Sequence, residues 1–267
     1  MAVLLITGAS GTLGATVADH AVAAGHEVRL LSRRSRSSND PAREWAVGDL
    51  LSGAGIDAAL DGADAVVHCA HDPGKPQATV IGTRNLVDAA RSRGPAHLVY
   101  ISIVGIDRVP NAYYRAKLDC ERLIAESGVP FTILRATQFH EFVLELVRKL
   151  SRGPLAMVPA KTPFQPIDVA EVAGRLVDLA VAAPARRVPD IGGPQVRSAE
   201  ELMRAYLTAA GKHRPVVPLP VPGKAAAAMR AGYLTVPERA VGGRTYDQFL
   251  AEQFMSAKAL PRKGVRR

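Results

Sequence analysis

Three glycines at fixed spacing near the N-terminus are the residues whose pattern most clearly indicates chemistry. Gly8, Gly11 and Gly14 lie in the run TGASGTLG at residues 7–14, directly after the apolar run VLLI at 3–6. A strand that ends in such a turn and opens a helix brings free backbone N–H groups to the positive end of a helix dipole, which suits a pyrophosphate. Glycine is required where a Cβ would obstruct the phosphates. The run predicts a dinucleotide site, although an ordinary strand–turn–helix junction shares its local signature.

A tyrosine and a lysine four residues apart form the second candidate. Tyr113 and Lys117 belong to the segment YYRAK at 113–117, and residues four apart share one face of a helix. The phenol of a free tyrosine has a pKa of about 10, and a nearby ammonium lowers it. Tyr114 lacks the four-residue offset. The spacing therefore predicts that Tyr113 acts as a general acid or base beside Lys117.

A serine ends the apolar run HLVYIS at 97–102. The carboxyl edge of a parallel sheet faces the crevice where doubly wound folds bind ligands. Ser102 is therefore the candidate that hydrogen-bonds a carbonyl protonated by Tyr113. The alternative is a serine that caps local backbone at the end of a strand.

The end of the second predicted strand carries arginines in place of an acid. In dinucleotide folds, an acidic residue about 20 positions beyond the glycine turn binds the adenosine ribose, whereas arginine suits a 2′-phosphate. The segment 28–34 contains no Asp or Glu, and Arg33 lies 33 − 14 = 19 residues past Gly14. Arg33 and Arg34 therefore favour NADP(H) over NAD(H). A solvated basic loop is the alternative, above all for Arg34.

Short apolar runs alternate with segments of helical period through the first half of the chain. Strands are predicted at 2–7, 27–32, 44–47, 64–69, 97–102 and 130–134. Helices are predicted at 12–24, 53–60, 76–93 and 112–127. This alternation is typical of right-handed crossovers and of a parallel sheet covered on both faces. We expect an α/β fold with a Rossmann-type doubly wound parallel sheet.

The pattern becomes irregular after residue 135. Further helices are predicted at 139–150, 169–183 and 198–210, with helical character again over 222–253. We expect a dinucleotide-binding core at 1–150, a small, mixed C-terminal substrate-covering subdomain at 151–255 and a disordered basic tail at 256–267. Residues 167–191 are expected to return to the core.

Composition limits the class of protein. The net charge of +9 comes from 34 basic and 25 acidic residues, but the basic clusters lack interleaved aromatics and a recognition motif, which argues against nucleic acid. No apolar run approaches the ~18 residues of a membrane span. The predicted first strand leaves no room for a signal peptide, and Cys69 and Cys120 fit a reduced compartment. We expect a cytoplasmic monomer or homodimer with a small-molecule substrate and no metal.

Eight short motifs extend the pattern over about residues 2–180. They are TGASGTLG at 7–14, GDL at 48–50, VVHCA at 66–70, GTRNL at 82–86, YISIVGID at 100–107, YYRAK at 113–117, SGVPFTILR at 127–135 and PIDVA at 166–170. In this combination the chain resembles a short-chain dehydrogenase/reductase of the extended or atypical branch, close to the NmrA-like NAD(P)-binding proteins of bacteria.

The resemblance, taken with the residue patterns, implies roles for individual positions. The cofactor contacts would be Gly8, Ser10, Gly11, Thr12, Leu13, Gly14, Arg33, Arg34, Asp49, Leu50, Ala70, His71 and Lys117. Among these, Asp49 and Leu50 would flank the adenine, and Lys117 would contact the nicotinamide ribose. Tyr113, Lys117 and Ser102 would be catalytic.

Four residues after the sixth strand are the substrate candidates. They are Gln138, Phe139, His140 and Phe164. Their apolar members would suit a hydrophobic or aromatic substrate but would serve equally well as core. For His140, a hydrogen-bonded residue at the start of a helix is the alternative role.

One position departs from the family pattern. Extended members commonly carry two hydroxyl-bearing residues in succession after the fifth strand. Here the second of these positions is occupied by Ile103, which has no hydroxyl. Ser102 could then point to the other face of its strand. The function expected is NADP(H)-dependent reduction of a carbonyl, or of an activated C=C or C=N bond, in a small hydrophobic molecule. A non-catalytic NADP(H)-binding sensor, and an epimerase or dehydratase with a tightly held cofactor, stay open.

Overall fold

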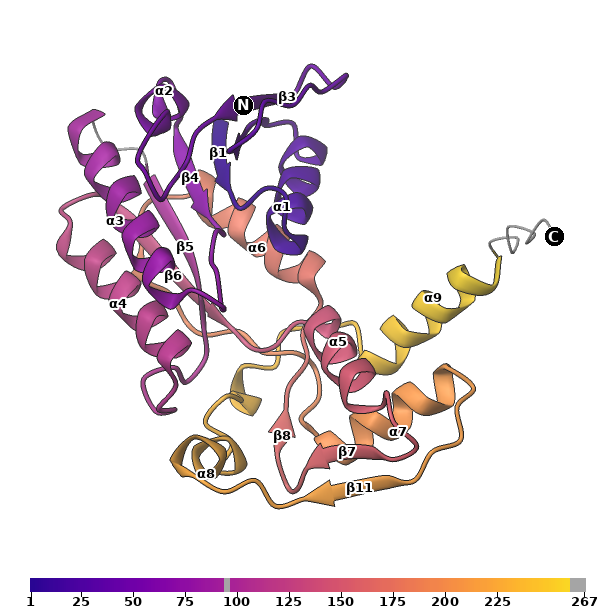
Figure 1. The fold of residues 1–267 in the computed structure, drawn as a ribbon. Coiled ribbons are helices and arrows are strands. Elements are labelled where there is room, and N and C mark those ends of the chain that lie inside the picture. Colours follow the sequence, from indigo (N-terminus) through magenta and orange to yellow (C-terminus); the bar gives the residue numbers. More distant parts are fainter. Residues whose placement is uncertain (94–96, 260–267) are drawn as a thin grey trace. The chain divides into compact units, whose positions relative to one another are not determined.

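A seven-stranded parallel sheet organises the first part of the molecule (Figure 1). The computed structural model describes residues 1–93 and 97–259. The strands are β1 (Val3–Thr7), β2 (Glu27–Ser32), β3 (Arg43–Val47), β4 (Ala65–His68), β5 (His97–Ile103), β6 (Phe131–Ala136) and β9 (Arg186–Arg187). Their order is β3-β2-β1-β4-β5-β6-β9. The expected doubly wound sheet is confirmed, and its order reverses direction between β1 and β4, where such folds bind ligands.

Helices cover both faces of this sheet. They are α1 (Thr12–Ala23), α2 (Ile56–Leu60), α3 (Pro76–Arg93), α4 (Ala112–Glu126) and α6 (Val169–Val181). Helix α1 packs against α6 on one face, and α3 packs against α4 on the other (Figure 1). Because both faces are covered, the central strands are mostly apolar, and every residue of β4 is buried.

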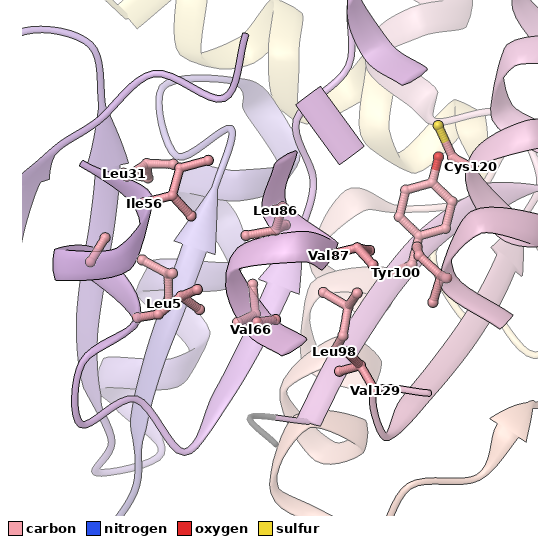
Figure 2. Packing of buried hydrophobic residues seen from close by; sticks show 14 of the residues in the cluster. Leu5, Leu31, Ile56, Val66, Leu86, Val87, Leu98, Tyr100, Cys120 and Val129 are labelled. Atoms are coloured by element: carbon pink, nitrogen blue, oxygen red, sulfur yellow. The ribbon is translucent and has the colours of Figure 1, made fainter. Parts of the chain in front are cut away.

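The core on the α3–α4 face joins side chains from β1, β4, β5 and both helices (Figure 2). Leu98 and Tyr100 stand two residues apart on β5 and are both fully buried in it. In Figure 2 the Tyr100 hydroxyl points toward Cys120 of α4. The alternation of β5 therefore directs even-numbered side chains toward α4, the helix that carries Tyr113 and Lys117.

The chain forms a second compact unit from residues 137–168 and from Gly192 onward. Its helices are α5 (His140–Leu150), α7 (Ala199–Ala209), α8 (Lys224–Arg230) and α9 (Tyr246–Ala259), with a short 3-10 turn at Pro237–Arg239. Its strands are β7 (Ala156–Pro159), β8 (Pro163–Phe164), β10 (Arg197–Ser198) and β11 (Val216–Leu219). Strands β7 and β11 pair in parallel and β8 and β10 antiparallel. Met203, Tyr206 and Phe249 lie in the core of this unit.

The two units divide the chain differently from the predicted domains. The first predicted boundary follows residue 150, whereas the first unit ends at Ala136. The segment Val169–Ile191 also belongs to the first unit, in agreement with the expected return of residues 167–191 to the core. Helix α5 belongs to the second unit because its apolar face packs against α7 and β7. Of the tail expected at 256–267, residues 256–259 form the last turn of α9, and the remainder lies outside the described residues.

A buried arginine holds α4 against the sheet. Arg135 of β6 donates through Nε and Nη2 to the two carboxylate oxygens of Glu121 at 2.8 and 2.7 Å, and through Nη1 to Asp107 at 2.7 Å. The side chains of Arg135 and Glu121 are 4% and 9% exposed, so the pair is desolvated. This bidentate contact fixes the position of α4 along β6.

We expect Arg135→Ala to lower the free energy of unfolding by about 3–5 kcal/mol, because the change leaves the buried Glu121 carboxylate without its partner. Chemical denaturation measures the loss. The matched control is Arg122→Ala, which removes a solvent-exposed pair with Asp119 and should cost about 1 kcal/mol or less. Equal losses in the two variants would contradict the assigned role of the buried pair.

Candidate functional site

The carboxyl ends of the parallel strands bring most predicted site residues to one edge of the first unit. The glycine turn follows β1, the arginines follow β2, Ala70 and His71 follow β4, and Ser102 lies near the end of β5. Helix α4 begins at this edge, where Asn111 accepts hydrogen bonds from the backbone N–H groups of Tyr113 and Tyr114. The cap places Tyr113 in the first turn of the helix.

The glycine turn is built so that backbone packs on backbone. Gly8 has a φ of +70°, and a Cβ there would lie 2.8 Å from the Ala70 nitrogen. A Cβ on Gly14 would lie 2.3 Å from the Gly8 carbonyl oxygen. Gly11 starts α1 without any side-chain cap, and the first turn of α1 holds no acidic residue. The N–H groups at this helix end and its uncompensated dipole fit a phosphate group.

Buried polar side chains for which the sequence predicts no role tie the turn to the neighbouring elements. The hydroxyl of Thr83 donates to the Thr79 carbonyl at 2.9 Å, so its oxygen accepts from Nε2–H of His68 at 3.0 Å. Nδ1 of His68 then accepts from the Thr7 hydroxyl at 2.7 Å. Burial lowers the pKa of His68 to about 3, which keeps the ring neutral. The only sequence signal for this network is a histidine inside an apolar strand.

Lys117 does not lower the pKa of Tyr113, contrary to the expectation from their spacing. Its Nζ donates to the Ile101 carbonyl at 2.6 Å and lies 4.1 Å from the centroid of the Tyr100 ring. The ammonium is thus held inside the unit, and burial lowers the pKa of Lys117 to about 8. Burial, reinforced by Tyr114, instead raises the pKa of Tyr113 well above its usual value. Tyr113 is a neutral phenol at physiological pH.

Ser102 lies on the face of β5 that α3 and α4 cover, because it is two residues beyond Tyr100. Its side chain is 1% exposed, and its Oγ has no hydrogen-bond partner within residues 1–93 and 97–259. Ile103 takes the opposite face. The Ile103 position therefore does not turn Ser102 away from α4, but a side chain this deeply buried offers no surface to a substrate.

The remaining cofactor candidates lie on loops of the same edge. Arg33 and Arg34 are exposed directly after β2. Asp49 is half-buried and accepts a hydrogen bond from the Leu51 nitrogen, while Leu50 accepts one from the Asn85 side chain. The turn residue Ser10 and the helix residue Thr12 are exposed, whereas Leu13 is buried.

Cys69 follows β4 and immediately precedes the loop of Ala70 and His71. Its side chain is 6% exposed, and burial raises the pKa of its thiol to about 12. Its carbonyl oxygen accepts a hydrogen bond from Nδ1–H of His71 at 3.1 Å.

The four substrate candidates lie in the second unit and mostly contribute to its interior. Phe164 is 5% exposed. Gln138 donates to the Leu234 carbonyl at 2.7 Å, and Phe139 is half-buried. His140 is fully buried, donates to the Arg244 carbonyl at 3.0 Å and belongs to an aromatic cluster. His140 therefore fits the structural alternative, because its burial leaves no surface for a substrate.

The described residues offer no metal centre. Within 1–93 and 97–259, no three His, Cys, Asp or Glu side chains gather closely enough to hold an ion. Across the same ranges, the helices are too short or too polar to span a bilayer.

The class of cofactor follows from the family to which the chain belongs. A family model described as NAD(P)H-binding matches residues 8–179. The chain belongs to this NAD(P)H-binding family. The match covers the sheet edge described above and confirms the resemblance to NAD(P)-binding proteins that the motifs indicate.

Individual relatives of this NAD(P)H-binding protein include reductases. It is 30% identical over 208 residues to the (4-alkanoyl-5-oxo-2,5-dihydrofuran-3-yl)methyl phosphate reductase of Streptomyces griseus, covering 74% of this chain and 70% of that protein. It is 27% identical to the photosystem II assembly factor Ycf39 of Trieres chinensis, over 64% of this chain and 57% of that one. The triphenylmethane reductase of Citrobacter sp., solved with NADP(H), shares the fold with a TM-score of 0.78 and 18% identity, over 94% of this chain and 99% of that chain.

We expect Gly8→Ala to weaken NADPH and NADH binding more than about tenfold, which corresponds to about 1.4 kcal/mol, because the new methyl group would meet the Ala70 backbone. Isothermal titration calorimetry measures the affinity. The matched control is Gly25→Ala, since Gly25 also has a positive φ, +80°, but a Cβ there would meet no atom within 4 Å. Similar weakening of cofactor binding by both changes would show that backbone strain at a positive φ, and not the contact with Ala70, explains the lost affinity.

The buried ammonium leads to a second, pH-dependent prediction. The pKa of Lys117 is lower in the folded protein than in the unfolded chain, so between about pH 8 and 10.5 the unfolded state binds more protons and this group adds stability as the pH rises. We expect Lys117→Met to stabilise the protein at pH 7 relative to the wild type, and this advantage to shrink by about 3 kcal/mol by pH 10.5. Urea denaturation across this pH range measures it, and parallel stability curves would contradict it.

Proposed function

We propose that the protein is an NADP(H)-dependent reductase that acts on a carbonyl, or on an activated C=C or C=N bond, of a small hydrophobic organic molecule. The observation that carries the proposal is the position of Tyr113, a half-exposed phenol in the first turn of α4 at the edge that also holds the glycine turn. The reductase relative from Streptomyces griseus supports the reaction class.

The preference for NADP(H) is inferred from the loop after β2. Arg33 and Arg34 are exposed there, and no carboxylate in 28–34 would repel a 2′-phosphate. A phosphate monoester carries nearly two negative charges and matches the guanidinium fork. The Citrobacter reductase, solved with NADP(H), is consistent with this preference.

The chain's own residues divide the work of a reduction. When bound, the nicotinamide supplies a hydride to the electrophilic carbon. In the reduction of a carbonyl, the Tyr113 hydroxyl supplies the proton to the oxygen that becomes negative, which completes the addition of two hydrogen atoms to the C=O bond, and the phenolate left on Tyr113 regains a proton from water. Its raised pKa keeps the proton on the phenol at neutral pH, and an alkoxide is basic enough to remove it.

The protonated phenol of Tyr113 also argues against an epimerase or dehydratase, whose reaction would begin with oxidation of the substrate. An epimerase that holds its cofactor tightly must first remove a proton from an alcohol, which requires phenolate. The raised pKa of Tyr113 makes phenolate scarce, so the site suits reduction better.

The proposal is tested by following NADPH oxidation with a panel of ketones and enones. We expect wild-type protein to consume NADPH faster than NADH, and Tyr113→Phe to lower kcat about 10²–10⁴-fold while NADPH affinity is retained. Arg33→Ala should weaken NADPH binding and leave NADH binding unchanged. Full activity of Tyr113→Phe would remove the phenol from the mechanism.

A second candidate function is a redox sensor that binds NADP(H) without turnover. Lys117 lies inside the unit and does not lower the pKa of Tyr113, and a relative from Trieres chinensis is named as an assembly factor. Tight NADPH binding without oxidation across the panel would favour this function over the reductase.

A further inference from the structure

Three aromatic side chains adjoin one another at the ligand edge of the first unit. The ring centroids of His71 and Tyr113 are 6.0 Å apart with an interplanar angle of 42°, and those of Tyr113 and Tyr114 are 5.9 Å apart at 45°. His71 follows β4, and the two tyrosines begin α4. We call His71, Tyr113 and Tyr114 the aromatic triplet.

The accessibility of the triplet distinguishes it from aromatic packing elsewhere in the protein. In the second unit, His140, Tyr246 and Phe249 form a comparable cluster with centroid separations of 5.2–6.1 Å. Those three rings are at most 2% exposed, so they serve the core. In the triplet, His71 is exposed and both tyrosines are only half-buried. Aromatic rings left accessible together beside a cofactor edge are typical of a ligand surface.

The triplet is uncharged at neutral pH. Partial desolvation by the surrounding protein lowers the pKa of His71, and burial raises the pKa values of Tyr113 and Tyr114. The nearby Lys117 ammonium, which also lowers the pKa of His71, disfavours a cationic ligand, and Asp72 disfavours an anionic one. The surface therefore suits a neutral, flat and polarisable molecule.

We propose that the aromatic triplet stacks against the conjugated ring of an uncharged aryl ketone or enone, with Tyr114 as a residue that determines specificity. This inference rests on the proposed reductase function and names its substrate class. Tyr113 would face the carbonyl oxygen as proton donor, while Tyr114 extends the ring surface without taking part in the chemistry. Aromatic stacking would distinguish such a substrate from a saturated ketone of the same size.

The test uses 2-acetylnaphthalene and its saturated analogue 2-acetyldecalin as probes. Both are titrated calorimetrically into the 267-residue chain saturated with NADP⁺, in which no reduction occurs. We expect the wild type to bind 2-acetylnaphthalene more tightly. Tyr114→Leu should lower its affinity about threefold to tenfold and leave the affinities for 2-acetyldecalin and NADP⁺ unchanged. Tyr114→Phe, which retains the ring, should behave as the wild type.

The outcomes separate this inference from the reductase proposal. Equal affinity of the wild type for both ketones, or an unchanged preference in Tyr114→Leu, overturns the stacking role while NADP⁺ binding still supports the proposed function. Failure of the wild type to bind NADP⁺ overturns both. Unchanged NADP⁺ affinity and circular dichroism of each variant show that a lost preference does not come from misfolding.

Discussion

The position of the candidate catalytic residues of α4 depends on the buried ion pair between Arg135 and Glu121. Glu121 is four residues from Lys117, and Lys117 is four from Tyr113, so the three occupy one stripe of α4. The Arg135 guanidinium holds Glu121, the last residue of this stripe, to β6 through hydrogen bonds of 2.7 and 2.8 Å. The position of Tyr113 is thereby set by a salt bridge two helical turns away.

The glycine turn, by contrast, is positioned by close packing of backbone on backbone and not by an ion pair. Gly8 and Gly14 let the start of α1 pack directly on the turn, and the neutral His68 joins Thr7 to Thr83 of α3. The Thr7 hydroxyl also accepts from the Ala70 nitrogen at 3.3 Å, which links the turn to the loop of His71. The glycine turn and the aromatic triplet are therefore parts of one hydrogen-bonded edge.

Much of the first unit could be predicted because its signals are local. Apolar runs specify the central strands, glycine spacing specifies the turn, and a four-residue offset places Tyr113 and Lys117 on one face. The second unit is harder to predict, since β8 and β10 have two residues each and show no periodicity. The Lys117 ammonium contacts the Ile101 carbonyl and the Tyr100 ring. The four-residue spacing alone does not show that these groups compete with Tyr113 for the ammonium. The burial of His140 likewise follows from packing against residues about a hundred positions away.

The thiol of Cys69 has a consequence for the chemistry proposed at this edge. Enones are electrophiles that alkylate thiolates, and Cys69 is only two residues from His71. Because burial keeps this sulfur protonated, it is a poor nucleophile. Under the proposed function, the site can therefore hold a Michael acceptor near a cysteine without alkylation of the thiol.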